Sequence, residues 1–560
     1  MLSDEILLGV TKPARYTGGE WNSVVKGDSG IDCRVALCFP DLYEVGMSHL
    51  GLKILYSILN DRRDVACERS FAPWHDMEKV MREKGIPLFS LETKRPLNEF
   101  DMVGFTLQYE LSYTNILNML DLSGIPLFSK DRDGSHPLIT GGGPCAFNPE
   151  PLADFFDCFV IGEGEEAVSE IVDAVIENKK SGAGRGKLLE RLSALEGVYV
   201  PSLPAGVAGM PKKIRKRFVA DLESAPFPEK PIVPFINVVH DRIQIEIMRG
   251  CRRACNFCQA CAIYGPNRFR SPAKILSLAE SIYRNTGYDE ISLVSLSSGD
   301  HPQIMEIITS LTGAFKEKAV SISFPSLRVE EMTSRFPLEL TSGRHTGLTF
   351  APEVGSEKMR KVINKDIPVE ALKECAYQAF KNNWRRIKLY FMIGLPQEEY
   401  SDLDAIVDLA REISEVKKRV DGRPADINAT ISVFIPKPHT RFEREAMLPI
   451  DEVYRRQKYI RDRSRSSQGT RSSRRSKVKF IFHDARMSYL ESVFARGDRE
   501  LSKALYIAWK NGCRFDSWKE YFDLERWLSA FKEASIDPDH YSSRERKLDE
   551  RLPWEFIALR

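Results

Sequence analysis

Short apolar segments alternate with amphipathic stretches over the first third of the chain. The apolar segments are 34–39, 101–107, 137–140 and 156–161, and a turn with glycine or proline follows each of them except 101–107. The stretch 48–59, by contrast, has the spacing of apolar residues that a helix needs. Short apolar strands separated by helices are typical of a parallel, doubly wound sheet, which binds ligands at the carboxyl ends of its strands. We therefore predict a Rossmann-like domain over residues 1–205.

Three further regions follow this domain. Residues 206–235 are rich in proline, glycine and lysine and predict a linker. Residues 236–445 return to alternating strands and helices, and residues 446–560 are mostly helical and charged. Within the last region, 461–479 is a basic, low-complexity insertion. It can be interpreted as an arm that contacts RNA or as a solvated loop, and the absence of interleaved aromatic residues favours the loop.

Composition narrows the class of protein. The 560 residues are 42% hydrophobic and 29% charged with a net charge of +2, which suits a globular protein of several domains and gives no bulk attraction to nucleic acid. No apolar run approaches the roughly 20 residues of a membrane helix. The first residues show no signal peptide, and the 11 cysteines are an odd number. We expect reduced thiols, a cytoplasmic location and no membrane partner.

Cysteines 251, 255 and 258 have the spacing C-x3-C-x2-C. Three thiolates can hold three irons of a 4Fe–4S cluster, which leaves the fourth iron open for chemistry. Cys261 extends the run, so a zinc site of four thiolates is the alternative. Paired C-x2-C knuckles are more usual for zinc, and the chain has no second knuckle. The spacing therefore favours the cluster, with Cys251, Cys255 and Cys258 as ligands and Cys261 outside the set.

The cysteine segment resembles that of radical S-adenosylmethionine (SAM) enzymes. An alternating strand at 244–247 precedes it, and Phe257 before the third cysteine is also typical of these enzymes. The resemblance implies a partial (β/α) barrel over 236–445, with SAM and substrate at the carboxyl ends of its strands. It also implies SAM contacts at the ends of successive strands. These residues are Phe257, Ser298, Gly299, Asp300, Ser326, Arg328, Glu353, Gly355, Ile393 and Gly394.

Other segments resemble one uncharacterised subfamily of these enzymes. They include 71–77, 107–115, 142–151, 433–440, 488–499 and 515–522. The subfamily carries an N-terminal cobalamin-binding-like domain, which here implies cobalamin contacts at Tyr43, Gly46, Gly104, Gln108, Gly141, Gly142 and Gly143. No histidine lies two residues after Asp41, so a bound cobalamin would lack a histidine ligand at that motif. The alternative is that the domain retains this fold without a corrinoid.

The resemblance implies an enzyme that cleaves SAM reductively to a 5′-deoxyadenosyl radical, with cobalamin-dependent methylation of an RNA or protein substrate as one outcome. Its catalytic residues are not identified. Expected partners are SAM, an electron donor such as flavodoxin or ferredoxin, and a small partner protein of the same family system. The alternative function is a non-catalytic zinc- or cluster-binding module that contacts RNA or a ribosomal partner through the basic insertion.

Overall fold

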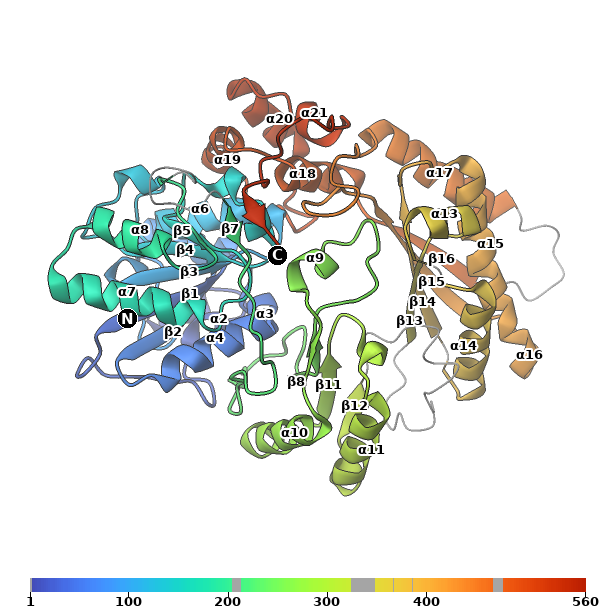
Figure 1. Ribbon diagram of the computed structural model, residues 1–560, viewed down its shortest axis with the longest axis horizontal. Helices are drawn as coiled ribbons and strands as arrows, with labels where there is room; N and C mark the ends of the chain where they lie inside the picture. The colour runs from blue at the N-terminus through green and yellow to red at the C-terminus, as the bar shows by residue number, and fades with distance from the viewer. Residues whose placement is uncertain are drawn as a thin grey trace.

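The computed structural model describes residues 3–203, 213–323, 348–365, 367–384, 386–466 and 477–559. The N-terminal α/β unit lies on one side of a central loop region, and the strands of a second unit lie below this region and on its other side (Figure 1). A set of C-terminal helices lies across the top of the view. The predicted arrangement of a doubly wound domain, an open set of barrel strands and a helical C-terminal region is confirmed. Within the described residues, no helix combines the length and apolar character needed to cross a membrane.

The N-terminal unit is a six-stranded sheet in the order β2-β1-β3-β4-β5-β6. The first five strands are parallel and β6 is antiparallel to β5. Every residue of β1 and β2 is buried, which explains why β1 is a nearly continuous apolar segment rather than an alternating one. The buried charges of β2 are compensated by ion pairs, Glu68 with Arg34 and Arg69 with Glu20. The strands are β1 Cys33–Phe39, β2 Val65–Phe71, β3 Met102–Thr106, β4 Leu138–Gly142, β5 Cys158–Val160 and β6 Val198–Tyr199.

Helices cover both faces of this sheet, as a doubly wound fold requires. One face packs against α4 Leu50–Asp61, α7 Ala167–Ser181 and α8 Arg185–Ser193. The other packs against α5 His75–Lys84 and α6 Tyr113–Leu122. The short helices α1 Asp4–Leu8, α2 Ala14–Thr17 and α3 Tyr43–Gly46 complete the unit. The strand order reverses between β1 and β3, which is where such sheets open a crevice for a ligand.

The second unit contains two parallel sheets. The first has the order β12-β11-β8 and the second has the order β13-β14-β15-β16. In the part of the chain that the structure describes, the two sheets are separate. Their strands are β8 Ile243–Glu246, β11 Glu290–Val294, β12 Ser321–Ser323, β13 Leu348–Glu353, β14 Arg386–Ile393, β15 Asp426–Val433 and β16 Lys477–Phe482. The helices of this unit are α9 Ala260–Tyr264, α10 Pro272–Thr286, α11 Ile304–Phe315, α13 Glu357–Val362, α14 Val369–Lys381, α15 Tyr400–Val416, α16 Lys418–Asp421 and α17 Ile450–Ser466.

The parallel sheet extends beyond the predicted domain boundary at residue 445. Its last strand, β16, follows α17 and includes the end of the basic insertion. Residues 467–476 of that insertion lie outside the described residues. In the predicted linker, β7 Ile214–Arg215 pairs with the C-terminal strand β17 Ile557–Ala558. The linker is therefore tied to the far end of the chain. Within the second unit, β9 Met248–Arg249 pairs with β10 Arg268–Phe269.

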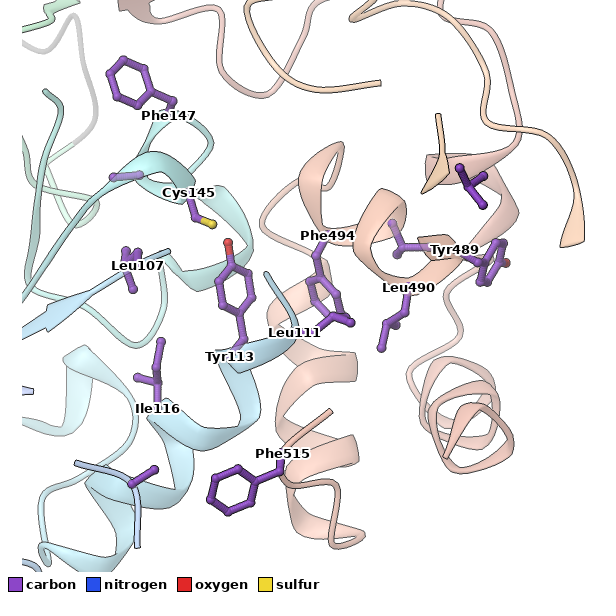
Figure 2. Packing of buried hydrophobic residues seen from close by; sticks show 14 of the residues in the cluster. Leu107, Leu111, Tyr113, Ile116, Cys145, Phe147, Tyr489, Leu490, Phe494 and Phe515 are labelled. Atoms are coloured by element: carbon purple, nitrogen blue, oxygen red, sulfur yellow. The ribbon is translucent and has the colours of Figure 1, made fainter. Parts of the chain in front are cut away.

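The C-terminal helices pack against the N-terminal unit. They are α18 Ala485–Ala495, α19 Leu501–Lys510, α20 Leu524–Glu533 and α21 Asp539–Ser542. Figure 2 shows Tyr113 and Ile116 of α6 beside Phe494 of α18 and Phe515. Polar contacts join the same surfaces, because Thr114 donates a hydrogen bond of 2.6 Å to the buried Asp516. One hydrophobic core thus continues across the two regions.

Candidate functional site: the cluster loop and a cavity between two sheets

The three cysteines lie on the loop that follows β9, between the two sheets of the second unit. Cys251, Cys255, Cys258 and Cys261 are all partly exposed free thiols. Burial raises the pKa of Cys258, and the neighbouring thiols raise it further. The same two effects raise the pKa of Cys261. Metal binding releases the protons of thiol ligands, so several neighbouring thiols on one loop suit a metal-binding role.

Contacts on both sides hold this loop in place. The Asn256 side chain donates a hydrogen bond of 2.8 Å to the carbonyl of Val362 in α13, and Asn364 donates one of 2.9 Å to Ala254. On the other side, Arg253 pairs with Asp300 at 2.6 Å. The structure therefore places Asp300, from the turn after β11, beside the cysteine loop and gives it a cationic partner. Its role as a SAM contact stays a prediction.

The donor set fits an iron–sulfur cluster in chemical type. Three thiols lie on one short loop with flanking polar anchors, and thiolates are the ligands such clusters use. Among the described residues, no three His, Cys, Asp or Glu side chains converge on the position of a single metal ion. The assignment of the three ligands, with Cys261 outside the set, stays a prediction.

A cavity of about 530 Å³ lies between the N-terminal sheet and the first sheet of the second unit. On the N-terminal side it is lined by the start of α4 and by the turns after β3, β4 and β5. On the other side it is lined by β8, β9, the end of β11 and α9. The carboxyl ends of both sets of strands thus face one space, which lies next to the cysteine loop because Arg249 and Gly250 form part of its wall.

Five of the predicted cobalamin contacts line this cavity: Gly104, Gln108, Gly141, Gly142 and Gly143. Gly143 has a φ of 126°, and a Cβ there would lie 2.7 Å from the carbonyl of Leu107, so the turn requires glycine. At Gly142 a Cβ would meet only Val160, at 3.7 Å, which leaves room beside the wall of the cavity.

Two predicted cobalamin contacts lie elsewhere. The Tyr43 hydroxyl donates a hydrogen bond of 2.9 Å to Glu20, inside a buried network with Arg69. A Cβ on Gly46 would lie 2.3 Å from the ring of Phe71, so this glycine serves the packing of α3. The turn after β1 therefore points away from the cavity, and its place is taken by the start of α4.

His49 is a cavity residue that sequence reasoning placed only in the following helix. It is the N-cap of α4, where its Nδ1 accepts a hydrogen bond of 3.1 Å from the Leu52 N–H. Burial lowers its pKa to about 4, so the imidazole is neutral. A polar residue directly before the first apolar residue of a predicted helix is the signal that could have placed it at the cap.

The predicted SAM contacts are distributed around the second unit. Ser298 is fully buried and its hydroxyl lies 2.8 Å from that of Ser295, a cavity residue, and Gly299 belongs to the same turn. Glu353 pairs with Lys365 at 2.8 Å. Phe257 packs in a small apolar cluster with Val354 and Leu395. Ser326 and Arg328 lie outside the described residues.

The remaining predicted contacts have structural neighbours. A Cβ on Gly355 would lie 2.2 Å from the backbone of Ala405 in α15, so this glycine allows a close approach between elements. Ile393 is fully buried in β14. Gly394 donates its N–H to Glu398 at 2.8 Å, and burial raises the pKa of Glu398 to about 7.

An ion-pair network joins the cysteine loop to the N-terminal sheet. Arg249, two residues before Cys251, pairs with Glu163 at 2.9 Å and with Glu165 at 2.7 Å, both from the turn after β5. It also pairs with Glu246 at 2.8 Å. Burial alone would lower the pKa of Arg249, but these carboxylates hold it above its usual value. We call Arg249 and these three glutamates the interdomain latch.

Comparison with known proteins agrees with this architecture. Residues 51–201 match the family model of the N-terminal domain of radical SAM proteins, and residues 245–410 match that of the radical SAM superfamily. An uncharacterized protein of Methanocaldococcus jannaschii is 26% identical over 505 residues, which cover 90% of this chain and 97% of that protein.

Two solved structures align with much of the chain. One is the radical SAM methyltransferase TsrM from Kitasatospora setae, solved with cobalamin and a 4Fe–4S cluster bound. Its sequence is 13% identical, the TM-score is 0.49, and the alignment covers 74% of this chain and 79% of that one. The other is the cobalamin-dependent SAM radical enzyme OxsB, with 13% identity, a TM-score of 0.47 and coverage of 89% and 71%. By its two family matches, this chain belongs to the radical SAM superfamily, whose members use a 4Fe–4S cluster and SAM, and carries the N-terminal domain of these proteins.

Proposed function

We propose that the protein is a radical SAM enzyme that uses a corrinoid, held between its two α/β units, to methylate its substrate. The observation that carries the proposal is the shared cavity. Strand ends of both units line it, and the loop of Cys251, Cys255 and Cys258 adjoins it. Two cofactors with related chemistry would thus bind next to each other.

The cavity has the character that a large planar ligand needs. Its volume lies within the usual range for binding pockets, about 300 to 1,000 Å³. Gly104 within β3 and the glycines at the end of β4 leave one wall without side chains, and apolar residues such as Ile54 and Leu296 line others. The reversal of strand order between β1 and β3 places this wall where open sheets bind cofactors.

Each group of residues then has a distinct role. When bound, the cluster supplies the electron that cleaves SAM to methionine and a 5′-deoxyadenosyl radical, and the corrinoid supplies a methyl carrier. Asp300 and Arg253 would orient the amino and carboxylate groups of SAM beside the cysteines. The interdomain latch would hold the two binding regions in register, and the buried walls would exclude water from the radical.

The proposal is tested by anaerobic reconstitution with iron, sulfide and hydroxocobalamin, followed by dithionite and SAM carrying a deuterated methyl group. Mass spectrometry should detect 5′-deoxyadenosine and methionine with the native chain, and neither product with Cys255→Ala. Macromolecules from a strain that lacks this protein should accept the deuterated methyl group from the native enzyme. A colourless, zinc-binding protein without SAM cleavage would instead support a non-catalytic module.

A further inference from the structure

A second cavity lies between the N-terminal unit and the C-terminal helices, and its volume is about 960 Å³. The segments that lead into β4 and β5, together with the start of α8, form one wall. The start of α19 and the end of α20 form the other. The cavity beside the cysteine loop meets the carboxyl ends of β4 and β5, so the second cavity lies at the opposite edge of the sheet. It is therefore separate from the SAM and corrinoid sites proposed above.

Cationic side chains outnumber carboxylates around this second cavity. The cations are Lys130, Arg132, Arg185, Arg499 and Lys503, against Asp154, Asp157 and Glu533. An anion in the cavity would bring these charges closer to balance.

Two of the cations share one carboxylate inside the wall. Arg132 and Arg185 both pair with the same oxygen of Asp157, at 2.7 and 2.6 Å. Arg132 and Asp157 are 0% and 1% exposed, so water screens this group of charges only weakly. Burial lowers the pKa of Arg132 and the neighbouring Arg185 also lowers it, although Asp157 acts in the opposite direction. The wall thus carries positive charge that Asp157 does not fully offset.

The other three cations are open to a ligand because their side chains are exposed. Lys503 is 60% exposed and Arg499 is 42% exposed, although each also pairs with one carboxylate. Lys130 is exposed too, and its ammonium makes no ion pair or hydrogen bond with any residue that the structure describes. Its Nζ lies 5.4 Å from the centroid of the Phe128 ring. The charge of Lys130 therefore stays available to an incoming anion.

An aromatic surface adjoins this ammonium. The rings of Phe128 and Tyr506 have centroids 5.3 Å apart, and both side chains are half-buried in the cavity wall. Leu189 and Ile507 add apolar surface. Cations that bind phosphate next to aromatic rings that stack on a base are the combination with which proteins hold nucleotides. The volume also lies within the usual range for sites of small ligands.

We propose that this cavity is a nucleotide-binding site, separate from the cavity at the cysteine loop. Lys130 donates to the phosphate, with Arg499 and Lys503 close to it, and the base lies against Phe128 and Tyr506. The nucleotide is either free or part of a single-stranded RNA, since both sources present the same phosphate and base.

Calorimetric titration of the full chain with guanosine 5′-monophosphate is the first test, because this base differs from the adenine of SAM. Lys130→Gln removes the charge but keeps most of the side chain, and it should lower affinity about tenfold, as expected for a lost hydrogen bond between charged groups. Its melting temperature should not fall, because Lys130 is exposed and unpaired within the described residues. Lys79→Gln removes another exposed lysine of the same unit, on α5, and as the matched control it should leave affinity unchanged.

The second test separates the base from the phosphate. Tyr506→Leu should lower affinity for the nucleotide about fivefold or more, because stacking on the ring is lost. Guanosine, which has no phosphate, should bind about tenfold more weakly than the nucleotide and should not respond to Lys130→Gln.

Competition then identifies the source of the nucleotide. A single-stranded RNA of about ten nucleotides that displaces the monophosphate would identify RNA as the ligand. An RNA that leaves the monophosphate bound would identify the free nucleotide.

Three results would overturn the inference. Native protein could show no heat of binding at millimolar nucleotide, or Lys130→Gln could bind as tightly as the native chain. SAM or hydroxocobalamin could also displace the nucleotide, which would place it in the cavity at the cysteine loop. None of these results bears on SAM cleavage or corrinoid retention, so the proposed function would stand.

Discussion

Replacing Arg249 by methionine should loosen the contact between the two α/β units. The methionine keeps much of the apolar stem of the side chain but removes the charge that faces Glu163, Glu165 and Glu246. The side chains of Arg249 and its partners are 8 to 15% exposed, so the network is largely shielded from water. Glu163 would keep its 2.7 Å pair with Arg268, so the loss falls mainly on the other two carboxylates.

The expected cost follows from this burial. Removing one partner of a buried ion pair typically costs about 3 to 5 kcal/mol, because the other charge stays buried without compensation. The slight exposure here favours the lower value, about 3 kcal/mol. In a unit of roughly 200 residues, a loss of that size lowers the melting temperature by about 6 to 12 °C.

Differential scanning calorimetry of the full chain without cofactors measures this shift. Arg249→Lys should give an intermediate loss, because an ammonium group cannot pair with several carboxylates in the geometry of a guanidinium. Lys79→Met is the control, because it removes an exposed ion pair with Glu83 that is worth at most about 1 kcal/mol. A shift for Arg249→Met no larger than that of the control would refute the role assigned to the interdomain latch.

Three further predictions concern the cysteine loop and the same interface. Alanine at any one of the three proposed cluster cysteines should abolish the iron-dependent absorbance of the reconstituted protein, whereas Cys261→Ala should keep it. Loss of that absorbance in Cys261→Ala would reopen the zinc assignment. Asp300→Ala should weaken SAM binding in calorimetry and leave the cluster spectrum intact, and unchanged affinity would separate Asp300 from the SAM site. Although burial alone would raise the pKa of Glu163, Arg268 and Arg249 hold it below its ordinary value of 4.5. The stability that Glu163 contributes is therefore complete above about pH 4.5 and is lost as the pH falls through the lower pKa of this carboxyl in the folded protein. Between pH 6 and pH 3, the melting temperature of Glu163→Gln should depend less on pH than that of the native protein.

The sequence was sufficient to predict the N-terminal sheet and part of its ligand face. Buried parallel strands produce continuous apolar segments, and the turns after them must reach the same edge of the sheet. Gly104 and Gly141 to Gly143 line the cavity, and their contact with a corrinoid stays a prediction. Tyr43 and Gly46 do not line the cavity, because a buried network around Glu20 and Arg69 sets the route of the chain after β1. Glu20 and Arg69 are far from this turn in the sequence.

Other features depend on contacts that local patterns do not encode. The interdomain latch joins residues 163 and 165 to residue 249, and neither segment predicts the other. Strand β16 adjoins a basic, low-complexity stretch, where composition suggests a solvated loop, yet it pairs with β15 along six residues. His49 was assigned to a helix, and only the fold shows that the start of this helix reaches the cavity.

The measurement that tests the central claim most directly is corrinoid retention by the native chain and by Gly142→Leu. A Cβ at residue 142 meets only Val160 at an ordinary contact distance, so the larger side chain should extend into the cavity without disturbing the sheet. After anaerobic incubation with hydroxocobalamin and gel filtration, the visible spectrum should show about one corrinoid per native chain and almost none in a Gly142→Leu protein with an unchanged melting temperature. A native protein peak without corrinoid absorbance, or equal retention by both proteins, would contradict the account.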